Sequence, residues 1–182
     1  MKAWGIALGI AIAALALALG VRRTQHVEFD YEIEAPVSDV VGAFAAIERY
    51  PEWTGGRADR GVIRDEREST DPAGNRIVEV DYSVWALGIE SSGTRVYTYA
   101  ADGSKASVEL RFFTWVSLED ASTRWEFEEV DGRTHIRQRG TRTTPWLFAA
   151  YLDFHSEQVL ALFQRIEHGI TSPPEVTAPG AG

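Results

Sequence analysis

Apolar and polar side chains alternate in the segment TQHVEFDYEIE (24–34). A period of two predicts a strand with one face buried and the other in water. The residues on the predicted buried face are Val27, Phe29, Tyr31 and Ile33. Glu28, Asp30, Glu32 and Glu34 lie on the other face, which is typical of a solvated sheet surface.

The segment after this strand is predicted to form a short helix. Pro36 occupies the place where a helix begins, since its fixed φ suits the first turn and its missing N–H costs nothing there. Apolar residues then follow at helical spacing from Val37 to Ile47, which indicates about three turns. Pro51 is predicted to end the helix, because the residue before a proline is disfavoured in the helical region.

The middle of the chain is predicted to form six further strands. They cover residues 58–68, 76–85, 94–100, 105–113, 122–130 and 134–143. Turn sequences lie between several of them, including Asp71–Asn75, Asp102-Gly103 and Asp131-Gly132. Short turns join neighbouring antiparallel strands, so an antiparallel sheet is expected.

The last part of the body changes to a helical period. Thr144 and Pro145 suit the N-cap and first position of a helix, and Gly169 suits its end, which predicts a helix of about 24 residues. Its apolar stripe consists of Phe148, Leu152, Val159, Leu162 and Ile166, with His155 in the middle. We therefore predict an α+β fold in which a curved antiparallel sheet wraps around this helix, leaving space between them for a ligand.

The composition excludes several classes of chemistry and partner. The chain has no cysteine, so disulfides, thiolate metal sites and cysteine nucleophiles are excluded. Its formal net charge is −9, and all 27 acidic residues lie after Val27. A body this acidic repels phosphate backbones, which argues against nucleic acid as a partner.

The start of the chain is predicted to be one transmembrane helix. Ala3–Val21 contains no charged residue and no proline, and 19 residues span roughly 28 Å, close to the thickness of a bilayer core. A cleaved signal peptide is the alternative. Arg22 and Arg23 favour a single-pass protein whose domain stays on the cytoplasmic side, and export is the alternative. We thus expect an anchor or signal peptide over 1–23, a domain over 24–170 and a disordered tail over 171–182.

The order of elements and several sequence stretches resemble the START-like superfamily, also called the SRPBCC or helix-grip group. The carriers are Ala35-Pro36, then Val40–Phe44, then the corner Tyr50–Trp53. The stretch Thr123–Phe127, a turn and Thr134–Gln138 resemble the closing hairpin of that group. The resemblance implies a helix-grip cavity for a hydrophobic small molecule, like that of the polyketide cyclase/dehydrase or coenzyme-Q-binding branches. It carries over no catalytic residue.

His155 is the first candidate ligand-binding residue. It lies in the middle of an apolar stripe, where an imidazole could bond a ligand carbonyl or act as a general base. The alternative is a core histidine whose ring is satisfied by a neighbouring strand.

The other candidates come from the strands and from the aromatic residues. Alternation from Ile136 turns Gln138 and Arg142 inward, where Arg142 would suit a carboxylate unless it extends to water. The same reasoning turns Tyr82 inward. Trp125 and Trp146 either pack in the core or line a pocket.

Three functions fit these features. The first is a membrane-anchored protein that binds a lipid, a quinone or a polyketide-like molecule. The second is a cyclase or dehydratase that uses a pocket histidine, and the third is an accessory subunit of a membrane complex. No cofactor and no metal site are predicted, since the histidines show no ligand spacing.

Overall fold

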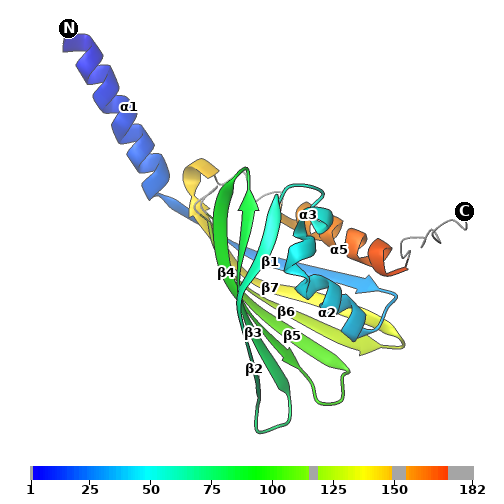
Figure 1. The fold of residues 1–182 in the computed structure, drawn as a ribbon. Helices are drawn as coiled ribbons and strands as arrows, with labels where there is room; N and C mark the ends of the chain where they lie inside the picture. Colours follow the sequence, from blue (N-terminus) through cyan, green and yellow to red (C-terminus); the bar gives the residue numbers. More distant parts are fainter. Residues whose placement is uncertain (1, 115–118, 149–154, 172–182) are drawn as a thin grey trace, which may run out of the picture.

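The computed structural model describes residues 2–114, 119–148 and 155–171, with side chains described from residue 8 and, in the last helix, from residue 157. The chain begins with α1 (Lys2–Gly20), which Figure 1 shows leading away from the sheet. The sequence predicts a membrane span over Ala3–Val21. That part of the predicted fold is not found, because no helix among the described residues is long and apolar enough to cross a membrane.

Seven antiparallel strands form one curved sheet. Their order across the sheet is β1-β7-β6-β5-β4-β3-β2, so the first and last strands pair with each other. The strands are β1 (Arg22–Ile33), β2 (Arg60–Thr70), β3 (Arg76–Ala86), β4 (Ile89–Tyr99), β5 (Lys105–Thr114), β6 (Glu119–Val130) and β7 (Arg133–Pro145). The predicted antiparallel sheet is confirmed.

The turns between strands follow from local chemistry. Asp131 and Gly132 both have positive φ, 52° and 76°, and join Val130 to its partner Arg133. Two successive positive φ angles make the tight turn that matches the twist of a hairpin. The predicted turn between β6 and β7 is therefore confirmed.

Helices of the described part of the chain cover one face of the sheet (Figure 1). They are α2 (Val37–Ala45), the single-turn α3 (Tyr50–Trp53) and α5 (His155–Thr171), with a 3₁₀ turn, η1 (Ile47–Arg49), between the first two. The sequence predicted that Pro51 ends the first helix, and this prediction is wrong. Pro51 lies in the first turn of α3. The helix from Val37 already ends at Ala45, because Ala46 leaves the helical region with a ψ of 76°.

The beginning of the long helix was predicted wrongly. Thr144 and Pro145 do not cap a helix but end β7, where they pair with Arg23 and Arg22. The 3₁₀ turn η2 (Trp146–Phe148) follows, and the Trp146 N–H donates to the Val21 carbonyl at 2.7 Å. The side chains of Thr144 and Pro145 favour the start of a helix. Their pairing with β1 overrides this local preference. Gly169 does not end α5 either, since the helix continues to Thr171.

Aromatic rings hold α5 against the sheet. Phe163 is fully buried, and its ring lies 5.4 Å from that of Trp125, 5.7 Å from that of Phe44 and 5.9 Å from that of Phe29. Rings at such separations add to the free energy already gained by burying their area. One helix residue thus joins β1, β6 and α2 into a single core.

The buried tyrosines predict a loss of stability in alkali. Burial raises the pKa of Tyr99 to about 12, and the nearby Tyr97 adds to the shift. The folded chain keeps this proton where an unfolded chain, with a tyrosine pKa of about 10, has lost it. The free energy of unfolding should therefore fall as the pH rises from about 10 to about 12. Urea unfolding across this range should show a shallower fall for Tyr99→Phe, and equal slopes would contradict the expectation.

Candidate functional site

A cavity of about 240 Å³ lies between the sheet and the helices α3 and α5, as bounded by the described residues. Its floor comes from β5, β6 and β7. The apolar part of its wall consists of Leu110, Phe112, Ala121, Trp125, Val159 and Leu162. Because these side chains alternate along the strands or share one helix face, the curvature of the sheet brings them together around one space.

A buried ion pair lies in the wall of this cavity. Glu119 on β6 is 1% exposed, and Arg142 on β7 is 7% exposed. The Arg142 Nε–H donates to Glu119 Oε1. Arg142 pairs in register with Ala121, two residues after Glu119 on the same face of β6, so the register sets the two charges side by side. A buried pair costs free energy to desolvate, and it persists only if both charges stay together.

Other polar atoms of the wall have no hydrogen-bonding partner among the described residues. They are Glu119 Oε2, Thr123 Oγ1 and Trp125 Nε1, and all three are buried. Leaving a buried polar group unpaired costs about 1–3 kcal/mol. An unpartnered acceptor, hydroxyl and donor on one strand therefore lie in residues of the cavity wall.

A second buried arginine lies directly behind this wall. Arg95 on β4 is 2% exposed and pairs in register with Leu110. Its Nη1 donates to the Phe44 carbonyl at 2.8 Å and to the Tyr97 hydroxyl at 3.0 Å. Its guanidinium also lies 5.1 Å from the ring of Tyr50, which lines the cavity. The buried Arg95 cation is thus stabilised by aromatic faces and a carbonyl, and it makes no ion pair with a described residue.

Two exposed arginines lie at the helix side of the cavity. Arg57 follows α3, and Arg165 is on α5. Arg165 Nη1 donates to the Trp53 carbonyl at 3.2 Å. Gly55 has a φ of +64°, and a Cβ there would come within 2.7 Å of Arg165 Nη2. The glycine therefore both permits the left-handed turn and leaves room for this guanidinium.

No protein-family profile matches the chain, and no curated protein matches it by sequence. Solved structures do match. Protein Ms6760 from Mycobacterium smegmatis is similar with a TM-score of 0.50 and 20% identity, over 80% of this chain and 90% of that one. The Zhui aromatase/cyclase from a Streptomyces species gives 0.50 and 14%, over 81% and 96%. Ara h 8.0201 gives 0.52 and 14%, over 82% and 99%.

The chain has the helix-grip fold. The fold that the resemblance implied is thereby confirmed, and the cavity described above is the space between its sheet and its last helix. Identities of this size establish the fold alone, so the ligand has to be inferred from the residues of this chain.

Three of the predicted site residues meet at the helix-grip cavity. Gln138, Arg142 and Trp125 all line it. The predicted alternation is confirmed along β7, where Ile136, Gln138 and Arg142 are buried. Arg142 does not extend to water, because Glu119 holds it inside.

The other three predicted residues are not part of the described wall. Tyr82 points into the core, where it stacks on Phe112 at 6.1 Å, and burial raises its pKa well above the ordinary value, so it stays neutral. Trp146 is 63% exposed and lies against Leu17 of α1, away from the cavity. The side chain of His155 lies outside the described residues.

Sequence reasoning missed Glu119, Arg57 and Arg165. The strand over β6 was predicted to begin at Ser122, three residues after its actual start, so Glu119 was left outside the predicted strand. The pattern itself contains a signal, since Glu119, Ala121, Thr123 and Trp125 alternate with exposed residues. Arg57 and Arg165 have no local signal, because only the packing of α5 brings them to one cavity.

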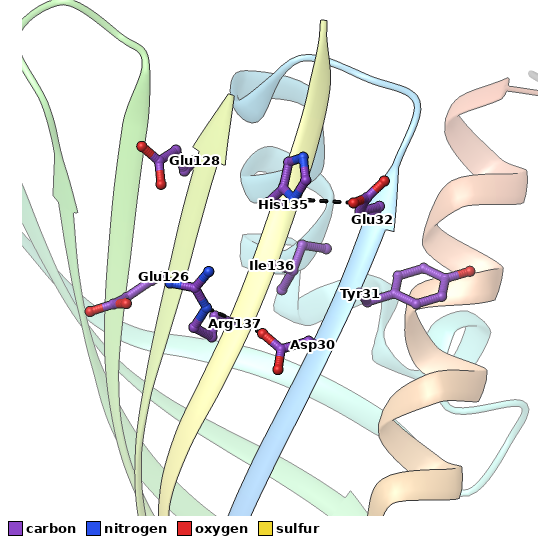
Figure 2. A pocket seen from close by; sticks show the side chains of 8 residues that line it. All are labelled: Asp30, Tyr31, Glu32, Glu126, Glu128, His135, Ile136 and Arg137. Atoms are coloured by element: carbon purple, nitrogen blue, oxygen red, sulfur yellow. Dashed lines mark hydrogen bonds and ion pairs between the residues drawn. The ribbon is translucent and has the colours of Figure 1, made fainter. Parts of the chain in front are cut away.

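A second hollow, of about 350 Å³, lies over β1, β6 and β7 and is shown in Figure 2. Its charged residues are exposed or half-buried, and several are paired: Asp30 with Arg137 and Glu32 with His135, each at 3.2 Å. Tyr31 extends from β1 toward α5, where its hydroxyl donates to Glu167 at 2.9 Å. Paired, solvated charges of this kind are typical of an outer sheet face. Within the described residues, no group of three or more histidines and carboxylates could hold a metal ion.

Proposed function

We propose that this chain binds a small hydrophobic molecule in the helix-grip cavity. The observation that supports this most directly is the composition of the wall, in which apolar side chains surround a few unpartnered polar atoms. Small-molecule sites combine the same two elements: apolar surface for affinity and a few polar groups for orientation.

The size of the cavity limits the ligand. Its volume of about 240 Å³ exceeds the ~150 Å³ of a cavity that holds benzene. It falls below the ~300 Å³ at which pockets for drug-sized molecules begin. A molecule of one or two rings fits this space, as does one end of a longer polyketide-like molecule or quinone.

Binding is favoured over catalysis by the state of Glu119. General acid–base chemistry requires a carboxylate or an imidazole that is available to the substrate. Glu119 is the one carboxylate among the described lining residues, and one of its oxygens already accepts from Arg142. A cyclase-type reaction is the second candidate, in line with the similar fold of an aromatase/cyclase.

Filling the cavity should weaken binding. Ala121→Phe adds a ring to the cavity floor, whereas Ser122→Phe adds the same ring to the exposed face of the same strand. Calorimetry with neutral one- and two-ring compounds, naphthamide among them, should show binding to the wild type. Ala121→Phe should weaken it by about tenfold or more, a change of about 1.4 kcal/mol, and Ser122→Phe should leave it unchanged. The proposal fails if no compound binds, or if both variants bind as the wild type does.

The location of the chain remains a prediction from its sequence. We propose from the composition of the apolar run Ala3–Val21, and not from the structure, that the domain is attached to a membrane, with Arg22 and Arg23 favouring the cytoplasmic side and export as the alternative. We also propose, from the same apolar run, that the chain has a partner within a membrane complex.

A further inference from the structure

The arginines of this chain differ in whether a carboxylate accompanies them. Nine of the described arginines make ion pairs: Arg49, Arg64, Arg67, Arg76, Arg124, Arg133, Arg137, Arg139 and Arg142. Such pairing is expected in a chain whose 27 acidic residues outnumber its 18 basic ones. An arginine that has no carboxylate partner among the described residues is therefore informative.

Three such arginines surround the helix-grip cavity. Arg57 and Arg165 line it, and Arg95 lies behind its wall against Tyr50. None of the three makes an ion pair with a described carboxylate. The only acidic residue of the described wall is Glu119, whose charge Arg142 balances. The described wall therefore holds three arginines, Arg57, Arg142 and Arg165, against one carboxylate.

The position of each arginine affects how strongly it can attract an anion in the cavity. Arg95 is 2% exposed, so little water screens its charge. Arg57 and Arg165 are exposed and lie on the same side of the cavity. There they can contact the end of a ligand that stays nearest to solvent. A guanidinium binds planar anions such as carboxylates through two parallel hydrogen bonds.

We propose that the cavity takes an organic anion: an apolar ring body that carries a carboxylate or a similar planar acid. The body lies against Leu110, Trp125 and Leu162, and the acid group meets Arg57 and Arg165. This inference rests on the proposed function, since it specifies the ligand of the same cavity.

A pair of probes with one shape tests the charge directly. Naphthoate and naphthamide have the same rings and a planar end group of similar size, and only naphthoate is an anion at neutral pH. Calorimetry at low salt should show naphthoate binding about tenfold more tightly than naphthamide, as expected for a charge-assisted contact. This preference should decrease with added salt, because ions screen exposed charges.

Variants of the arginines identify the residues responsible. Arg57→Gln/Arg165→Gln should remove the preference for naphthoate, so that this variant binds naphthoate and naphthamide with affinities within about twofold of each other. Arg111→Gln is the matched control, because Arg111 is exposed on β5, makes no ion pair with a described residue and lies outside this cavity. It should leave the binding of both probes unchanged.

The outcomes separate the two proposals. If naphthamide binds and Ala121→Phe weakens that binding by about tenfold or more, the proposed function stands. If naphthoate then binds no better, or if its advantage survives the double arginine variant, the anion inference is overturned. If neither probe binds, the proposed function fails, and the inference fails with it.

Discussion

Phe163→Ala is expected to lower the free energy of unfolding by about 3–5 kcal/mol, the range for removing a buried aromatic ring. Phe163 is fully buried, and its ring lies near those of Phe29, Phe44 and Trp125. The substitution leaves a void where β1, β6, α2 and α5 meet, and a close-packed interior cannot collapse around it without strain. Urea denaturation followed by far-ultraviolet circular dichroism measures this loss.

A control on the same helix separates packing from helix propensity. Leu160→Ala changes a 37% exposed residue of α5 and should cost much less than Phe163→Ala. Because Trp125 both contacts Phe163 and lines the cavity, Phe163→Ala should also weaken the binding of naphthamide. Equal losses of stability for the two variants would show that α5 is not held by its aromatic face.

Arg142→Gln is expected to cost about 3–5 kcal/mol, the range for breaking a buried ion pair by removing one partner. Glu119 would then remain 1% exposed without its cation. The double variant Glu119→Gln/Arg142→Gln should lose less than the two single losses added together, because it leaves no buried charge uncompensated. A double-mutant cycle from urea denaturation provides this comparison.

An exposed ion pair is the matched control for this cycle. Arg137 and Asp30 pair at 3.2 Å on the outer face, with about half or more of each side chain in water. Arg137→Gln should change the free energy of unfolding by less than about 1 kcal/mol. If Arg142→Gln were as mild as Arg137→Gln, the buried pair would have no special role in the wall.

Much of the fold follows from local patterns in the sequence. The alternation along 24–34 gave the strand β1 and its buried face, and Asp131-Gly132 gave the hairpin that joins β6 to β7. Both are local effects, since side chains alternate along any strand and tight hairpins need positive φ. The errors lie where a distant segment decides the local structure. Thr144 and Pro145 look like a helix start, but they continue a strand because β1 pairs with them.

The candidate site divides in the same way. The inward position of Gln138 and Arg142 could be predicted from alternation alone, because the apolar Ile136 shows which face of the strand is buried. Tyr82 was turned inward correctly, yet it lies in the core and not in the cavity wall, since alternation gives the face of the sheet but not the position across it. Trp146 was assigned to a helix that does not begin there, so its exposed position could not be foreseen.

The sequence by itself determined the antiparallel sheet, the apolar helix that covers it, the inward face of several strands and the acidic character of the body. These properties depend on hydrophobic period, turn chemistry and composition, all of which are local features of the sequence. Only the tertiary structure decided which polar residues meet. Glu119 and Arg142 come together through the register of β6 and β7, and Arg57 and Arg165 through the packing of α5 beside α3. The chemistry of the cavity depends on contacts between residues far apart in the chain, and no local pattern encodes those distances.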